Sequence, residues 1–76
     1  MEERIIKVVG LAFNVDVSSY IIDDCVPDKI EGWDSLAFLN LISLLEEEFN
    51  TSFGFDDIAE MSEGGKEMLS IIEKYI

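Results

Sequence analysis

The sequence contains no histidine, one cysteine, one proline and only five basic residues. Without histidine the chain lacks the commonest general base and the commonest metal ligand, so we expect neither self-contained nucleophilic catalysis nor a metal site. The single cysteine, Cys25, excludes an internal disulfide. No signal peptide and no long apolar run are visible, so we expect a reduced, cytoplasmic protein without a membrane span.

Basic residues are outnumbered by 17 acidic ones, which gives a formal net charge of -12. Such a charge repels nucleic acid and anionic lipid headgroups and attracts basic protein surfaces. In many proteins a charge of this sign serves only solubility. We therefore expect no nucleic acid and no membrane as partners, and the positions of the acidic residues must decide between docking and solubility.

The chain of 76 residues is expected to form a single domain, residues 1–76. A domain of this size hides only about 60% of the surface of its unfolded chain, which leaves little room for an enclosed active site. Apolar residues make up 49% of the sequence, and they are spread evenly enough to supply a core. The composition therefore predicts a small globular domain.

Apolar residues recur at helical spacing in three longer segments and one short one. The predicted helices span residues 2–13, 35–49, 56–61 and 66–76, with a turn at Gly54 and a break at Gly64 and Gly65. A long loop at 14–34 joins the first two helices, and we expect a helical turn within it at 17–22. The fold class predicted is all-α, a small four-helix bundle of three longer helices and one short helix.

Ser35 stands where the long loop ends and the most apolar helix begins. Free backbone N–H groups and the positive end of the helix dipole favour an anion there by about 0.3–1 kcal/mol. The alternative is that Asp34 or Ser35 only caps the helix. A serine hydrolase would need a glycine two positions after its nucleophile, where this chain has Ala37, and it would need a base. We therefore do not expect an autonomous serine enzyme.

Three stretches resemble the phosphopantetheine attachment region of acyl carrier proteins: DSL at 34–36, the following leucine-rich helix that ends in LEEEF at 45–49, and the acidic FDDIAEM at 55–61. The resemblance extends along the chain and includes its size and charge. It implies that Ser35 receives 4'-phosphopantetheine from coenzyme A through a separate phosphopantetheinyl transferase, which Asp34 helps to recognise. The thiol of this arm would carry acyl groups as thioesters, so the chain would be a carrier and not an enzyme.

The resemblance also implies a monomer whose central helix meets basic patches on acyl-activating, acyl-transfer or condensing enzymes. Glutamates at 46–48 near the C-terminus of that helix face the negative end of its dipole, which favours a functional face over local stability. A solvated run of charges is the alternative. The expected docking residues are Leu36, Leu39, Asn40, Ser43, Glu46, Glu47, Asp56 and Met61.

Three positions depart from the carriers of fatty acid synthases. Ala37 and Asn40 stand where those carriers are usually acidic, and Trp33 stands where they usually have a small residue. The sequence thus resembles stand-alone carriers of specialised lipid or polyketide pathways, with an aminoacyl or D-alanyl carrier as the alternative. An alternative of another class is an acidic helical interaction module that is never modified. Trp33 either anchors the loop or contacts a partner.

Overall fold

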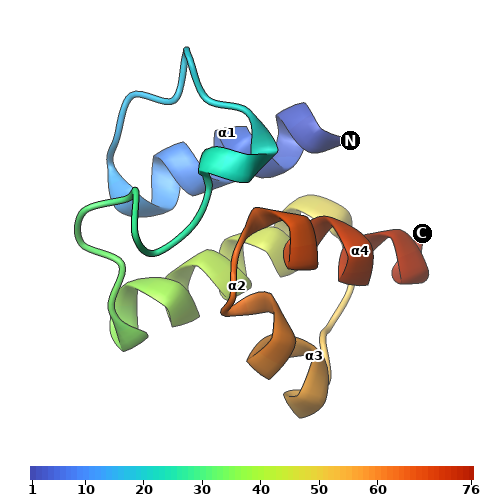
Figure 1. Ribbon diagram of the computed structural model, residues 1–76. Helices are drawn as coiled ribbons and strands as arrows, with labels where there is room; N and C mark the ends of the chain where they lie inside the picture. Colours follow the sequence, from blue (N-terminus) through green and yellow to red (C-terminus); the bar gives the residue numbers. More distant parts are fainter.

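Four α-helices and one 3-10 turn make up the fold. The computed structural model describes all residues 1–76 and contains α1 (Glu2–Phe13), η1 (Ile22–Asp24), α2 (Ser35–Phe49), α3 (Phe55–Met61) and α4 (Gly65–Tyr75) (Figure 1). There is no β-strand. This confirms the predicted all-α bundle of three longer helices and one short helix, with a long loop between the first two. No helix combines the length and apolarity needed to cross a bilayer.

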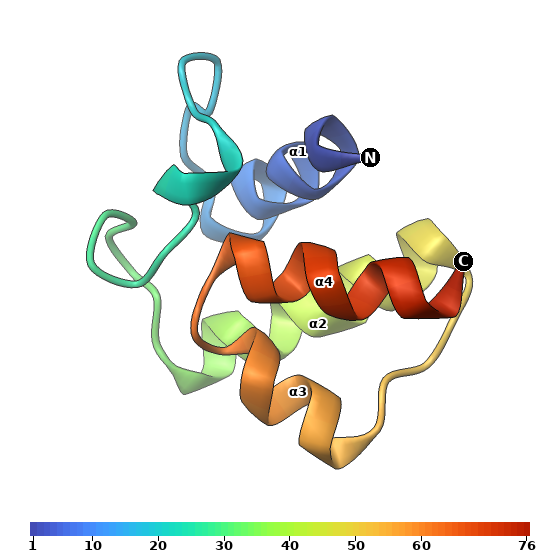
Figure 2. The same cartoon turned by 45° about the vertical axis from the view of Figure 1, so that its right-hand side comes forward.

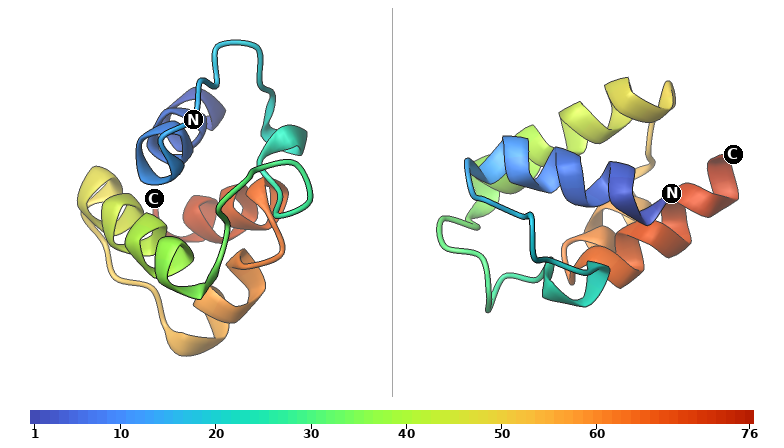
Figure 3. Two further views of the ribbon diagram at one scale, coloured as in Figure 1. Left: turned by 90° about the vertical axis from the view of Figure 1, so that its left-hand side faces the viewer. Right: turned by 90° about the horizontal axis from the view of Figure 1, so that it is seen from above.

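The helices surround a single apolar core. Viewed along α2 in the left panel of Figure 3, α2 and α4 lie on either side, α1 lies above them and α3 below. Both termini lie at one end of the bundle, and α2 begins at the opposite end (Figures 1 and 2). The core contains no polar or charged side chain. It is formed by Ile5, Val8, Val9, Ile22, Cys25, Ile30, Phe38, Leu41, Ile42, Leu45, Phe49, Phe53, Met61, Met68, Ile71 and Ile72.

Asparagines end the first two long helices. Asn14 after α1 has a φ of 54° and Asn50 after α2 has a φ of 52°, so both adopt the left-handed conformation. Asparagine tolerates this conformation better than most residues because its short polar side chain bonds locally. The backbone N–H of each asparagine donates back into its helix, to Gly10 and Glu46 respectively. These two caps define where α1 and α2 stop.

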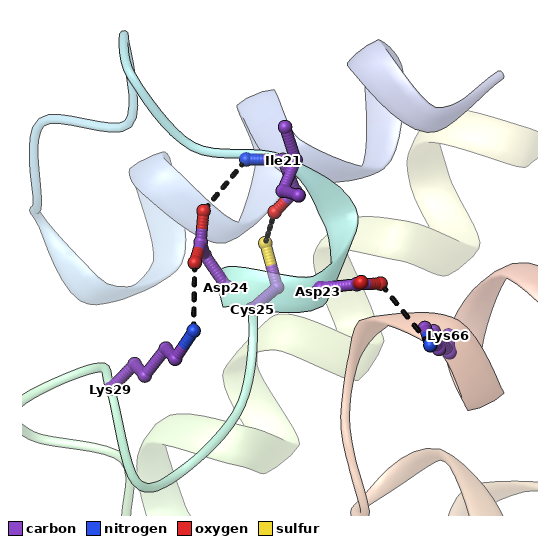
Figure 4. A network of polar contacts seen from close by, with 6 residues as sticks. All are labelled: Ile21, Asp23, Asp24, Cys25, Lys29 and Lys66. Carbon is purple, nitrogen blue, oxygen red and sulfur yellow. Dashed lines mark hydrogen bonds and ion pairs between the residues drawn. The ribbon is translucent and has the colours of Figure 1, made fainter.

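The helical turn within the long loop lies at Ile22–Asp24, so it shares only Ile22 with the predicted range of 17–22. Asp24 determines its position. One carboxylate oxygen of Asp24 accepts the backbone N–H of Ile21 at 3.0 Å, and the other pairs with Lys29 Nζ at 3.0 Å (Figure 4). The side chain therefore replaces a backbone acceptor at the start of the turn. The spacing of apolar residues alone could not indicate that the turn starts at Ile22.

The turn η1 packs directly on the start of α4. Gly65 is the first residue of α4, and its backbone N–H donates to the carbonyl of Cys25 at 2.7 Å. A Cβ atom on Gly65 would lie 2.5 Å from the carbonyl oxygen of Ile22, so only glycine fits. Asp23 and Lys66 add an ion pair at 3.5 Å across the same junction (Figure 4). Gly65, predicted to be part of a break in the chain, is therefore the first residue of α4 and allows α4 to pack closely on η1.

Candidate functional site

Asp34 is the residue that caps α2. Its backbone is extended, and its Oδ1 accepts the backbone N–H of Ala37 at 2.8 Å. Ser35 is the first residue of the helix, and it is exposed. Because Asp34 supplies the cap, the hydroxyl of Ser35 is not required for one. The site therefore presents an exposed primary hydroxyl at the positive end of the most apolar helix.

Trp33 stacks with two other aromatic rings. Its ring stacks on Phe13 of α1 with centroids 4.8 Å apart and an interplanar angle of 18°. Phe38 of α2 lies 6.1 Å from it with an angle of 14°. Gly32, with a φ of 88°, provides the turn that leads into this stack. Of the two roles considered for Trp33, the structure supports the loop anchor, and the stack ties the segment before Ser35 to both α1 and α2.

An open pocket of about 290 Å³ lies beside Ser35. It brings together the loop before α2, the first turn of α2 and the residue that follows α3. The sequence does not show that Phe38 and Ser62 line this pocket, because residues far apart in the chain meet there only after folding. The pocket is lined by Pro27, Trp33, Asp34, Ser35, Phe38 and Ser62. A larger open pocket, of about 630 Å³, lies between α1 and the loop that follows it and does not include Ser35.

Most of the expected docking residues lie on the exposed side of α2. Leu36 is 80% exposed and Leu39 is 54% exposed. Their spacing places them on one face of α2, opposite its buried face. The exposed members of the expected set are Leu36, Leu39, Asn40, Ser43 and Glu47 on α2 and Asp56 on α3.

Met61 does not belong to this face. Its side chain is fully buried at the end of α3 and forms part of the core. A residue with no exposed surface cannot contact a docked protein, so Met61 is removed from the expected docking set. The segment 55–61 is too short for its apolar spacing to show which side faces inward, and this explains the error.

The glutamates at the end of α2 have separate roles. Glu46 Oε2 accepts the backbone N–H of Phe53 at 2.9 Å and so holds the loop after α2. Glu48 Oε2 pairs with Arg4 Nε at 2.8 Å, and the Arg4 guanidinium also lies 4.4 Å from the ring centroid of Phe49. Two of the three glutamates therefore stabilise the fold. Of the three glutamates, only Glu47 faces the negative end of the helix dipole without a side-chain partner that compensates for it.

Positive charge is absent from a long central part of the chain. Lys29 and Lys66 are the last basic residue before α2 and the first after α3. Between them the only charged residues are acidic: Glu31, Asp34, Glu46, Glu47, Glu48, Asp56, Asp57, Glu60 and Glu63. The surface formed by α2 and α3 is therefore uniformly negative, apart from the reach of Arg4 to Glu48.

No protein-family model, curated protein or solved structure matches the chain.

Cys25 is the one residue of the chain that is a strong nucleophile in its ionised form, but its surroundings suppress that form. The side chain is fully buried, and its Sγ–H points to the carbonyl of Ile21 at 3.9 Å (Figure 4). Burial, followed by the negative charge of Asp24, raises the pKa of the Cys25 thiol to about 11. Cys25 is thus an inert packing residue at neutral pH. Ser35, by contrast, is exposed.

Proposed function

We propose that the chain is an acyl carrier protein that carries 4'-phosphopantetheine on Ser35. The observation that supports this most directly is the exposed hydroxyl of Ser35, which stands on the first residue of α2 while Asp34 provides the helix cap. The likeness of the segments at 34–36 and 45–49 to carrier attachment regions supports the choice of this group. The position fits that group because a phosphodiester there meets the free N–H groups and positive dipole end of α2.

In the attachment step, the Ser35 oxygen attacks the phosphorus of coenzyme A that bears the pantetheine. A new phosphodiester P–O bond forms, the pyrophosphate P–O bond breaks, and adenosine 3',5'-bisphosphate leaves. The hydroxyl proton passes to a base of the transferase, since this chain has no histidine. Once bound, the arm supplies a thiol that holds acyl groups as thioesters. The chain itself contributes position and recognition.

The acidic surface of α2 and α3 is the proposed docking face for partner enzymes. Exposed Leu36 and Leu39 provide an apolar centre, and Glu47 and Asp56 provide charges that attract lysine and arginine. Electrostatic attraction of this kind raises association rates more than it prolongs binding, which suits a carrier that visits several enzymes. We propose acyl cargo of a specialised lipid or polyketide pathway in the cytoplasm, with an aminoacyl or D-alanyl cargo as the alternative.

Modification by a transferase tests the proposal. The purified chain is incubated with coenzyme A and a broad-specificity phosphopantetheinyl transferase, and its intact mass is measured. We expect the wild type to gain one phosphopantetheinyl group and Ser35→Ala to gain none. Ser70→Ala is the matched control, because Ser70 is an exposed serine of α4 outside the expected docking set, and it should be modified like the wild type.

The same experiment separates the carrier from an unmodified interaction module. The exposed leucines on an acidic face would also suit a module that binds a basic protein without modification. Such a module predicts no mass gain and unchanged partner binding in Ser35→Ala. A wild type that stays unmodified with an active transferase, shown by a known carrier in the same reaction, would contradict the proposed function.

A further inference from the structure

We infer that the pocket beside Ser35 holds the pantoyl segment of the arm, so that the arm lies against Trp33 and Phe38 and does not extend freely into solvent. This inference rests on the proposed function, because it requires an arm on Ser35. It adds a binding role for Pro27, Trp33, Phe38 and Ser62, none of which is needed for attachment itself.

The position of Ser35 makes the pocket continuous with the attachment point. Ser35 lines the pocket, so any group esterified to its oxygen begins at the pocket wall. The volume of about 290 Å³ is just below the range for pockets that hold drug-sized ligands, which is roughly 300–1,000 Å³. A short branched segment suits this volume, whereas a long acyl chain does not. The pocket therefore fits the part of the arm nearest the protein.

The chemistry of the walls matches that segment. Next to its phosphate, the pantoyl unit has a carbon with two methyl groups, then a hydroxyl and an amide. Pro27, Trp33 and Phe38 offer apolar surface to the methyl groups. The Ser62 hydroxyl donates to the carbonyl of Ala59 at 2.6 Å, so its lone pairs remain available to an O–H or N–H of the arm.

Charge decides which end of the arm enters the pocket. Asp34 lines the pocket, and its negative charge would repel a phosphate placed inside it. The first N–H groups of α2 attract the phosphate instead. The phosphate is thus directed to the helix terminus, and the neutral pantoyl segment is left for the pocket.

The aromatic stack makes one wall of the pocket rigid before the arm arrives. Trp33 stacks with Phe13 and with Phe38 and is half-buried, so its ring has little freedom to lose when a ligand packs on the part that stays exposed. Preorganisation of this kind lowers the entropic cost of binding. An attached group also has a high effective concentration at a pocket beside its own attachment point, so even a weak contact is populated.

Nuclear magnetic resonance of the modified protein tests the inference. The chain is converted with coenzyme A and a transferase, and complete conversion is confirmed by mass. We expect nuclear Overhauser effects between the arm's methyl protons and the ring protons of Trp33 and Phe38. Because Trp33 is the only tryptophan, its indole N–H signal is unambiguous, and it should shift between the unmodified and modified forms.

Two serine variants identify the polar contact. Ser62→Ala should be modified fully but show weaker methyl-to-ring effects and a smaller indole shift, whereas Ser70→Ala, on α4 and outside the pocket, should match the wild type. Full modification with arm signals at the positions of free pantetheine, and no effects to Trp33, would overturn the pocket inference while leaving the carrier intact. Absence of any mass gain would overturn both.

Discussion

The phenol of Tyr75, in the last turn of α4, donates a hydrogen bond to Asp57 in the first turn of α3. The same oxygen of Asp57 accepts the backbone N–H of Gly54 at 3.3 Å. The Tyr75 ring also meets Phe53 edge-on, with centroids 5.3 Å apart. Since Glu46 of α2 bonds the backbone of Phe53, this cluster joins the N-terminal end of α3 to both α2 and α4.

This cluster predicts a loss of stability in strong alkali. The hydrogen bond to Asp57, followed by desolvation and the negative charge of Asp57, raises the pKa of Tyr75 above its ordinary value of 10.0. A folded-state pKa above the unfolded value stabilises the fold below pH 10 and ceases to do so as the pH rises through the folded pKa. The melting temperature should therefore fall above pH 10 more steeply in the wild type than in Tyr75→Phe. Tyr20→Phe is the matched control and should keep the wild-type dependence; equal slopes for all three proteins would contradict the prediction.

Arg4 should contribute more to stability than the other basic residue of α1. It pairs with Glu48, bonds the Glu48 carbonyl at 2.9 Å and lies over Phe49, whereas Lys7 forms no ion pair in the structure. We expect Arg4→Ala to lower the free energy of unfolding by about 1 kcal/mol, since its pair is half exposed and the cation–π contact is modest. Lys7→Ala removes the same charge and should change it by less than about 0.5 kcal/mol. If urea unfolding shows the same loss of unfolding free energy for Arg4→Ala and Lys7→Ala, net charge alone is responsible.

Gly65 should be intolerant of even one methyl group. A Cβ atom there meets the Ile22 carbonyl oxygen of η1 at 2.5 Å and the Cβ of Cys25, the residue after η1, at 3.0 Å. We expect Gly65→Ala to destabilise the fold by about 1–3 kcal/mol, the range of overpacked interiors. At Gly54 the nearest atom lies 3.7 Å away, so Gly54→Ala should cost less than about 1 kcal/mol. Thermal melts compare the two, and a harmless Gly65→Ala would show that η1 moves aside.

Asp34 is predicted to have two separable roles. As the N-cap of α2 it accepts the Ala37 N–H, so Asp34→Ala should cost about 1 kcal/mol. Asn caps helices as well as Asp does, so Asp34→Asn should be nearly as stable as the wild type. If the transferase recognises the charge, Asp34→Asn should nevertheless be modified more slowly. Mass measured against time tests this, and wild-type rates for Asp34→Asn would limit Asp34 to capping.

The parts of the fold that depend on local pattern were predictable from the sequence. The predicted bounds of α1 and α2 match the structure, because apolar spacing is long and regular there and an asparagine follows each helix. The predicted start of α4 differs by one residue, because Gly65 serves packing and does not break the helix. The exposed position of Ser35 follows from the same local pattern.

Features that depend on distant residues were not predictable. The hydrogen bond from Arg4 to Glu48 joins residues 44 positions apart, and the sequence of α2 alone does not predict it. The inward position of Met61 is likewise set by packing, since the short α3 shows no clear apolar stripe. The pocket beside Ser35 needs the end of α3 to return to the start of α2. The spacing of apolar residues locates the helices, but only the folded structure shows which side chains are buried or paired with another part of the chain.

Few carboxylates of the proposed docking face on α2 and α3 take part in ion pairs within the chain. The three pairs of the chain employ Arg4, Lys29 and Lys66, and of the carboxylates on α2 and α3 only Glu48 has such a partner. A lysine or arginine that approaches Glu47, Asp56 or Glu60 therefore displaces no native cation. In the proposed docking, binding and release of a partner would both leave the internal pairs intact, so the face would need no rearrangement between one partner and the next.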